Sequence, residues 1–318
     1  MHYDIFNGDA DGIFALQQYR LANPLSDTKL ITGVKRDILL LSQVENLKDS
    51  SLTIFDISLD SNRTWLMQLL GDQNKVVYFD HHFAGTIPES PFLNVYIDPS
   101  PDTCTSLIVN ATLGGKHVLW AICGAFGDNL HQIAQGRAKV HGLTEYQTGQ
   151  LQELGELFNY NGYGAVIEDL YYHPKDLYQA IKPYDNPFAF IENSKELVAL
   201  REGYRQDIDS AMQLKEMPAT GKNRVYILPD TPWARRVTGV FSNFRAREKP
   251  DAAHAVITED KNNTLRISVR APLNDRRDAD TLCKLFPTGG GRKSAAGINS
   301  LPADQLEKFL EKFLSFYR

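Results

Sequence analysis

Short apolar runs alternate with amphipathic segments over the first eighty or so residues of the chain. The runs are rich in β-prone residues and predict buried strands, whereas apolar positions at helical spacing predict helices between them. The predicted strands are Tyr3–Phe6, Leu30–Val34, Ser51–Ile57 and Val76–Phe79, and the predicted helices include Ile13–Leu21 and Asn62–Leu70. This alternation favours an α/β fold with a doubly wound parallel sheet.

Polar residues of a few chemical types follow these strands directly. Asp9 and Asp11 lie in the turn after the first strand, Asp56 closes the third, and Asp80, His81 and His82 end the fourth. Because the carboxyl ends of parallel strands meet at one edge of a sheet, we expect these side chains to lie together there. Carboxylates and imidazoles are metal-ligand types.

Each of these patterns also has an ordinary explanation. An Asp-rich turn before a helix is often only an N-cap, so Asp9-x-Asp11 leaves capping and metal binding open. Asp128 follows the apolar run Val118–Phe126, where we expect another strand end, although an isolated Gly-Asp-Asn is an ordinary turn. Cys104-Thr105-Ser106, near the start of a predicted helix at Thr103–Leu113, offers hydrogen-bond donors to an anion.

The rest of the chain predicts a second, smaller α/β domain. Phe188–Met217 has a long helical pattern, and Pro218–Asn223 has the composition of a boundary. We therefore predict a metal domain at 1–187, a helical linker at 188–221 and a second domain at 222–318, with the active site in the cleft between the domains. The predicted elements of the second domain are strands Arg224–Leu228, Ala252–Thr258 and Leu265–Arg270, helices Trp233–Arg247, Ala279–Phe286 and Ala303–Tyr317, and a loop at Thr288–Ser294.

Charge is divided unevenly between these predicted parts. Residues from 222 onward contain 18 Lys+Arg and 11 Asp+Glu, against 16 and 28 before them, within a net charge of −5. The acidic part suits multivalent cations and the basic part suits a phosphate or nucleotide. The chain lacks the overall positive charge that is expected of a protein that binds long nucleic acids.

Composition is otherwise ordinary for a soluble protein. The sequence is 42% hydrophobic and 23% charged, with no apolar run of membrane-spanning length. The start lacks a basic region and an apolar signal core, so we expect no secretion, no membrane partner and a cytoplasmic location. Three cysteines without a Cys-x-x-Cys pair predict reduced, mostly buried thiols.

Taken as a set, these motifs resemble those of the DHH phosphoesterases with their associated C-terminal domain, an architecture found in nanoRNases and RecJ-like exonucleases. The matching segments are Asp9-Ala10-Asp11-Gly12, Asp56, Asp80-His81-His82, Gly127-Asp128, Ser268-Val269-Arg270 and Gly289–Gly297. Two positions depart from the family pattern. Asn7 stands where many relatives carry a His, which gives one metal a weaker ligand set, and Arg292 stands where relatives often place a His.

The resemblance implies a role for each motif. Two Mn²⁺ ions, or Mg²⁺ or another divalent cation, would be bound with Asp56 as the bridging ligand. Asp9 would complete one ion's ligands, whereas Asp11, His81 and Asp128 would complete the other's. Asp80 and His82 are the implied catalytic residues, Asp80 orienting a His and His82 contacting the phosphate. The residues implied to hold the far end of the substrate are Arg270, Gly289, Gly290, Gly291 and Arg292.

The function expected from this resemblance is hydrolysis of very short 5′-phosphorylated RNA. Linear dinucleotides such as pGpG or pApA are the favoured substrates. Alternatives within the class are a phosphatase of 3′-phosphoadenosine 5′-phosphate and a cyclic-dinucleotide phosphodiesterase. An alternative of another class is a catalytically silent nucleotide-binding sensor. A homodimer is compatible with the sequence.

Overall fold

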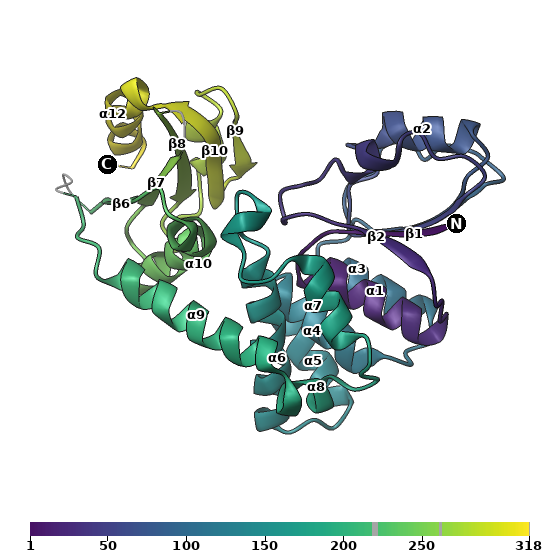
Figure 1. Cartoon of the computed structure of the whole chain (residues 1–318). Helices are drawn as coiled ribbons and strands as arrows, with labels where there is room; N and C mark the ends of the chain where they lie inside the picture. The colour runs from purple at the N-terminus through teal and green to yellow at the C-terminus, as the bar shows by residue number, and fades with distance from the viewer. Residues whose placement is uncertain (218–221, 261–262, 318) are drawn as a thin grey trace. The chain divides into compact units, whose positions relative to one another are not determined.

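The structure of the protein is a computed structural model that describes residues 1–217, 222–260 and 263–317. The chain divides into two compact units, Met1–Glu202 and Gly203–Arg318, which are described separately below (Figure 1). The division falls within a long helix, α9 (Lys195–Met212), inside the predicted linker. The predicted domain boundaries therefore stay predictions, and residues 218–221 of the linker lie outside the described residues.

The first unit is built on a five-stranded parallel sheet with strand order β2-β1-β3-β4-β5. Its strands are β1 (His2–Phe6), β2 (Thr28–Ile31), β3 (Ser51–Phe55), β4 (Lys75–Asp80) and β5 (Leu93–Ile97). The four predicted strands are present, and β5 is an additional one. β5 is an edge strand whose residues alternate between partly buried and exposed positions, and none of them is fully buried.

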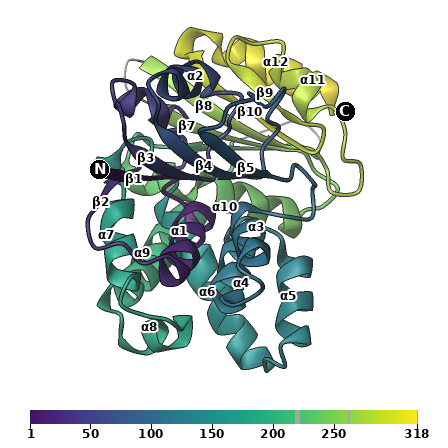
Figure 2. The same ribbon diagram turned by 90° about the vertical axis from the view of Figure 1, so that its right-hand side faces the viewer.

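Helical elements cover both faces of this sheet, which confirms the doubly wound architecture. On one face Ile54 and Tyr78 pack in a core with η1 (Leu40–Val44) and α2 (Arg63–Gly71). On the other face Phe55 stacks on Phe79 with ring centroids 5.6 Å apart, and Tyr19 of α1 packs on both rings. Figure 2 shows α2 on one side of the strands and α1 and α3 on the other. The alternation follows from the two-residue period of a strand.

The other helices of the first unit pack in a layer with α1. The helices and 3-10 turns are α1 (Ala10–Ala22), α3 (Thr105–Thr112), α4 (Val118–Gly127), α5 (His131–Val140), α6 (Glu145–Asn161), η2 (Ile167–Asp169), α7 (Pro174–Ile181) and α8 (Pro187–Asn193). Helix α1 contacts α3, α4, α6 and α7, while α5 packs on α4 and α8 on α6. The predicted helix over Phe188–Met217 is in fact two, because the chain is extended at Ser194 between α8 and α9.

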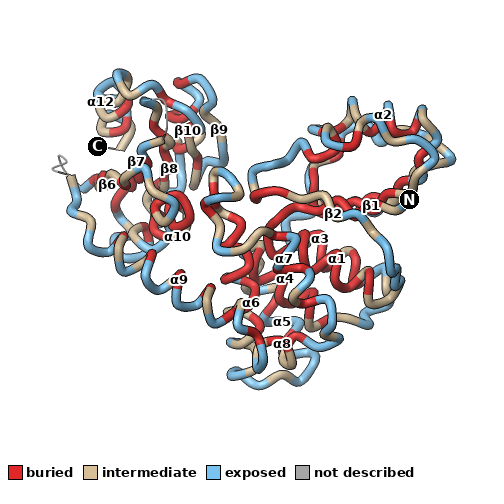
Figure 3. The backbone as a smooth tube through the Cα atoms, in the orientation of Figure 1, coloured by how far each residue is buried: buried red, intermediate tan, exposed pale blue. Residues whose placement is uncertain are grey.

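The apolar run Val118–Phe126 is a helix, α4, so the prediction that Asp128 ends a strand was wrong. Every residue of α4 except Leu119 is buried, because α1, α3, α5 and α6 pack around it (Figure 3). A helix that is apolar on all sides has no helical period in its sequence and resembles a buried strand. Asp128 is the C-cap residue of this helix.

Two glycines let α4 approach its neighbours closely. A Cβ on Gly124 would clash with Ser106 Oγ of α3 and would lie 3.2 Å from Asp11 Oδ1, whereas a Cβ on Gly127 would clash with the Cβ of Ala10. The separation of these helices is therefore set by residues without a side chain, and Asp128 follows directly after the tightest part of the packing.

The second unit is a mixed five-stranded sheet of order β6-β7-β8-β10-β9, in which only β6 and β7 are parallel. Its elements are β6 (Arg224–Leu228), α10 (Pro232–Glu248), β7 (His254–Asp260), β8 (Thr264–Arg270), α11 (Ala279–Cys283), β9 (Gly289–Arg292), β10 (Ala295–Pro302), η4 (Ala303–Gln305) and α12 (Leu306–Phe316). Phe309 and Phe313 of α12 pack in its core. This unit confirms the predicted smaller α/β part.

The glycine-rich segment Thr288–Ser294 is largely an edge strand, so its prediction as a loop was wrong. β9 pairs antiparallel with β10, and the register places Arg292 opposite Ala295 and Gly289 opposite Ile298. Consecutive glycines lower strand propensity, but pairing with the apolar half of β10 outweighs that cost here. Gly291 has φ 137°, which a residue with a side chain rarely adopts.

Two smaller expectations concern cysteines and membranes. Cys104, Cys123 and Cys283 are free and buried, as predicted. None of the helices within the described ranges is both long enough and apolar enough to cross a bilayer.

The packing of α4 yields a stability prediction. We expect Gly124→Ala to lower the stability of the protein by about 1–3 kcal/mol, because the new methyl overpacks the contact with Ser106. Gly136→Ala in α5 is the matched control: its Cβ meets open space, so it should stabilise by about 0.5–1 kcal/mol. Thermal unfolding of both variants measures this, and an unchanged melting temperature for Gly124→Ala would contradict the tight packing.

Candidate metal centre

Acidic residues converge where adjacent strands of the first sheet end. Asp9 is the N-cap of α1 just after β1, and Asp11 lies in the first turn of that helix. Asp56 follows β3, and His81 follows β4. The parallel arrangement of β1, β3 and β4 therefore brings these side chains to one sheet edge, as the sequence predicted.

Asp9 is engaged through both carboxylate oxygens. Gly12 N donates to Oδ1 at 3.1 Å, which is the capping interaction, and Lys35 Nζ lies 2.6 Å from Oδ2. Burial alone would raise the pKa of Asp9, but the charge and hydrogen bond of Lys35 hold it below the usual value. The Asp9 carboxylate is thus already neutralised by a cation of the protein itself.

The carboxylate of Asp11 is held by the start of α3. Thr105 N donates to Oδ2 and Ser106 N donates to Oδ1, each at 2.7 Å, and Ser106 Oγ donates to the Asp11 carbonyl. The donors predicted at Cys104–Ser106 therefore serve an anion, and that anion is the chain's own Asp11. Helix N-terminal amides stabilise such a charge, and the remaining lone pairs of both oxygens stay available to a metal ion.

Asp56 lies at the centre of the cluster with a left-handed backbone, φ 58°. Its Oδ1 accepts a hydrogen bond from Thr105 Oγ1 at 3.1 Å and lies 3.4 Å from His81 Nε2. His81 Nε2 is also 3.9 Å from Asp128 Oδ2. One imidazole nitrogen thus faces carboxylates from a strand end and from the end of α4.

The electrostatics of the cluster show an excess of buried negative charge. Burial and the neighbouring Asp9 and Asp11 raise the pKa of Asp56 well above its usual value, and burial together with Asp11 raises the pKa of Asp128 to about 6. Although burial opposes protonation of His81, the hydrogen bond to Asp56 and the other carboxylates raise its pKa to about 10. A divalent cation would relieve this repulsion, so the donor set fits an oxygen-preferring metal ion.

His82 is held beside this cluster by Asp80. His82 Nδ1 lies 2.6 Å from Asp80 Oδ1, which also accepts from His81 N at 2.9 Å. Atoms of Asp56, His81 and His82 lie within 4.8 Å of one another. The hydrogen bond to Asp80 leaves Nε2 of the half-exposed His82 to contact a ligand, so the structure orients His82 rather than His81 through Asp80.

Arg63 of α2 ties down the segment that follows His82. Its guanidinium donates to the backbone carbonyls of Ala84 and Thr86 and pairs with Asp60 Oδ1 at 3.0 Å. The next residue after the histidines, Phe83, is 73% exposed. The connection from β4 to β5 contains no helix, and Arg63 anchors the part of it that directly follows the histidines, where Ala84 also packs in the core.

Comparison with solved structures identifies this architecture. Exonuclease RecJ bound to manganese matches 99% of this chain and 89% of its own at a TM-score of 0.65 and 14% sequence identity. The pGpG-specific phosphodiesterase PggH from Vibrio cholerae matches 100% of this chain and 99% of its own at a TM-score of 0.59 and 12% identity. The chain has the fold of the DHH phosphoesterases.

A third solved structure with this DHH fold is longer than the present chain. RecJ from Thermus thermophilus, in complex with Mn²⁺, matches 99% of this chain at 15% identity and a TM-score of 0.61, and the match spans 52% of the RecJ chain. No family model and no curated protein matches the sequence. At these identities the comparisons establish the fold of the protein.

Within the DHH fold, the site contains one residue that the sequence analysis missed. Lys35 follows β2, and its Nζ reaches Asp9 and also donates to Asn159 Oδ1 at 2.8 Å. Burial would lower the pKa of Lys35, but Asp9 raises it well above its usual value. The sequence contained a signal for this residue, because Lys35 comes directly after the predicted strand Leu30–Val34. The rule that placed Asp56 and His81, that polar residues after parallel strands meet at one sheet edge, therefore applies to Lys35 too.

The predicted substrate residues form a separate group in the second unit of the DHH fold. Ala295 of β10, the strand between β8 and β9, is paired with Arg270 of β8 on one side and with Arg292 of β9 on the other. Because directly paired residues point to the same face of a sheet, the two arginine side chains share a face. Arg270 Nε donates to Asn243 Oδ1 at 2.7 Å, which fixes its guanidinium against α10. The structure thus places two of the predicted cations at one end of three neighbouring strands.

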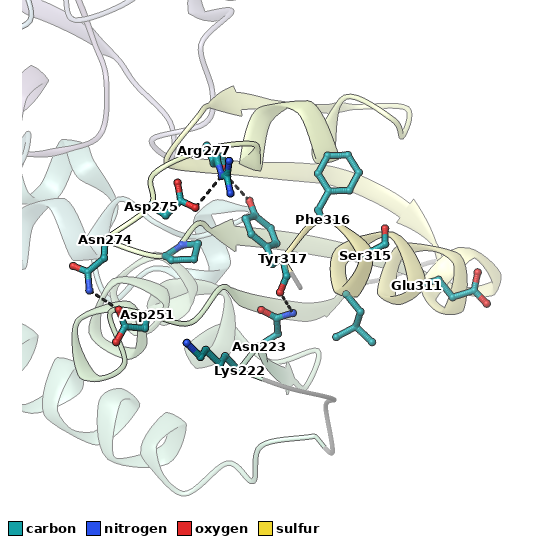
Figure 4. A pocket seen from close by; sticks show the side chains of 12 residues that line it. Lys222, Asn223, Asp251, Asn274, Asp275, Arg277, Glu311, Ser315, Phe316 and Tyr317 are labelled. Atoms are coloured by element: carbon teal, nitrogen blue, oxygen red, sulfur yellow. Dashed lines mark hydrogen bonds and ion pairs between the residues drawn. The ribbon is translucent and has the colours of Figure 1, made fainter.

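The second unit also has a hollow of about 910 Å³ that contains none of the predicted residues. Within its lining Arg277 pairs with Asp275 at 2.8 Å, and Tyr317 donates to the Arg277 carbonyl (Figure 4). Its lining begins at Lys222 and ends at Tyr317, next to residues outside the described ranges. We assign this hollow no role.

The crowded charges at Asp56 lead to a stability prediction that reverses with metal. In EDTA, Asp56→Asn should raise the melting temperature, because it removes a buried charge next to Asp9 and Asp11. The expected gain in the free energy of unfolding is about 1 kcal/mol or more. Asn also accepts the left-handed backbone that Ala would strain. In excess Mn²⁺ the wild type should become the more stable, because only it gains the full free energy of ion binding.

Asp49→Asn is the matched control for this comparison. Asp49 also has a positive φ of 47°, but it is exposed, so the substitution should shift the melting temperature little in either buffer. If the melting temperatures of the wild type and Asp56→Asn keep the same order with and without Mn²⁺, Asp56 does not bind the ion.

Proposed function

We propose that the protein is a divalent-metal-dependent phosphodiesterase that hydrolyses short 5′-phosphorylated oligonucleotides, with linear dinucleotides such as pGpG or pApA favoured. The observation that carries this proposal is the buried cluster of Asp11, Asp56, His81 and Asp128 beside a histidine held by a carboxylate. Solved neighbours with this fold support it: RecJ binds manganese, and PggH is described as a pGpG-specific phosphodiesterase.

The residues of the cluster suit this chemistry. Asp56, His81 and Asp128 would hold the metal with Asp11, and Mn²⁺ is the proposed ion because it accepts both carboxylate and imidazole ligands. A bound divalent ion would supply Lewis-acid activation of the phosphate and of the attacking water. Whether two ions bind, as the family resemblance implied, depends on whether Asp9 is free to act as a ligand.

His82 would bind the reacting phosphate through Nε2. Its Nδ1–H donates to Asp80, which fixes the ring orientation and directs Nε2 away from Asp80, where it could contact a phosphate oxygen. Such a charge-assisted hydrogen bond strengthens as negative charge builds up on the phosphate oxygens in the transition state. Asp80 therefore acts through His82.

Substrate length would be limited by the second group of cations. We propose that Arg270, Arg292 and the backbone of Gly289–Gly291 bind the end of the substrate away from the reacting phosphate. Two observations support this: the two guanidinium groups share one face of the second sheet, and the residues from 222 onward are net positive. Planar guanidinium groups can hold a phosphate with two hydrogen bonds or stack on a base.

The experiment that tests the function is product analysis across a panel of candidate substrates. With Mn²⁺, the wild type should convert pGpG or pApA to mononucleotides faster than it cleaves cyclic dinucleotides, longer RNA or 3′-phosphoadenosine 5′-phosphate. EDTA and Asp56→Asn should each abolish turnover. Preferred release of phosphate from 3′-phosphoadenosine 5′-phosphate would replace the proposed substrate, and binding of nucleotides without turnover would indicate the sensor.

The pairing of Asp80 with His82 predicts a specific kinetic defect. Asp80→Asn should lower kcat by about 10–100-fold while the affinity for Mn²⁺ stays within a few fold, because the imidazole loses its orienting carboxylate but the metal ligands remain. Asp98→Asn is the control, since Asp98 follows β5 at the same sheet edge but is exposed. Parallel loss of Mn²⁺ affinity would reassign Asp80 to support of the metal centre.

A further inference from the structure

Lys35 occupies the position on Asp9 that a second metal ion would need. Its Nζ lies 2.6 Å from Asp9 Oδ2, which is a short charge-assisted contact between a buried carboxylate and a side chain only 24% exposed. The other Asp9 oxygen caps α1 through Gly12 N. The amide bond leaves a lone pair on Oδ1, so the obstacle to a metal ion at Asp9 is the Lys35 ammonium, which occupies Oδ2 and would repel a second cation.

The Lys35 ammonium is held by more than this one contact. It donates to Asn159 Oδ1 at 2.8 Å, and it lies 5.3 Å from the centroid of the Tyr163 ring, which adds a cation–π interaction. Asn159 and Tyr163 lie at the end of α6 and just after it, while Asp9 begins α1. Three separate groups from two parts of the first unit thus surround the charge.

The backbone of Lys35 is fixed by the residue that departs from the family pattern. Lys35 N donates to the Gly162 carbonyl at 2.9 Å, and Asn7 Nδ2 donates to the Lys35 carbonyl at 3.4 Å. Asn7 stands where many DHH phosphoesterases carry a His that would serve the same ion as Asp9. In this chain the residue at that place supports a lysine instead of offering an imidazole.

Asn7 Oδ1 is buried and has no partner within the described residues, and this is the observation that favours a further ion. A neutral amide oxygen is a weak ligand, and an ion bound to it and to Asp56 would stand beside the Lys35 ammonium. The repulsion between the two cations would be strong in this buried site. A water molecule satisfies the amide oxygen without that cost.

We propose that the centre binds one divalent ion per chain, held by Asp11, Asp56, His81 and Asp128, and that the Lys35 ammonium takes the place of the second ion. Lys35 is a fixed positive charge on Asp9, and it neutralises that carboxylate permanently. This inference rests on the proposed metal-dependent function, but the number of bound ions can be measured without turnover.

The test is the stoichiometry of Mn²⁺ bound to the full chain. Equilibrium dialysis with elemental analysis should give one Mn²⁺ per chain for the wild type, and electron paramagnetic resonance should show mononuclear Mn²⁺ without the exchange-coupled signal of a pair. Lys35→Ala frees Asp9 and should raise the stoichiometry to two. Lys48→Ala is the matched control, because Lys48 pairs with Asp72 on an exposed surface of the same unit, and it should leave one ion bound.

Asp9→Asn provides a second, independent measurement in case Lys35→Ala unfolds. Asn keeps the capping interaction, so the helix start is preserved. The variant should still bind one ion, whereas a centre with two ions would lose one. Two ions in the wild type, or no gain in a folded Lys35→Ala protein, would overturn the proposal.

Turnover of the substrate panel, measured on the same protein as the Mn²⁺ stoichiometry, separates this inference from the proposed function. A wild type that binds two ions and hydrolyses pGpG would keep the function and reject the role of Lys35. A wild type that binds one ion but hydrolyses nothing in the substrate panel would keep the role of Lys35 and reject the function.

Discussion

The structure of the first unit depends on how four carboxylates can be buried together. Asp9, Asp11, Asp56 and Asp128 lie at or near one sheet edge, and like charges in a buried site repel each other strongly. Each is compensated differently: Asp9 by Lys35, Asp11 by the first amides of α3, and Asp56 and Asp128 by His81. Lys35 neutralises Asp9 with a full positive charge, whereas the oxygens of Asp11, Asp56 and Asp128 keep lone pairs that could bind a metal ion.

Much of this arrangement could be read from the sequence because parallel strands obey a simple rule. Polar residues directly after an apolar strand meet at one sheet edge, and this rule placed Asp9, Asp56 and His81 correctly. Asp128 reached the same cluster by a different route, from the end of the buried helix α4. The sequence rule grouped Asp128 with the other carboxylates for the wrong reason, because an all-apolar helix and a buried strand have the same pattern.

Other features depended on contacts between segments far apart in the chain. The two hydrogen bonds from α3 to Asp11 join residues more than 90 positions apart, and the contact of Lys35 with Asn159 joins residues 124 positions apart. Nothing local in the sequence around either partner indicates such a contact. The glycine-rich β9 was likewise misjudged because its pairing with β10, and not its own propensity, makes it a strand.

The anchoring of the segment after His82 by Arg63 has a consequence for the thermodynamics of binding. A surface segment without helix or strand normally loses conformational freedom when a ligand orders it, and that loss weakens binding. Here one guanidinium already holds the carbonyls of Ala84 and Thr86 to α2, while Asp80 holds the imidazole. Part of the ordering entropy is therefore lost during folding, so a ligand of His82, such as the phosphate proposed above, would order less of the chain on binding.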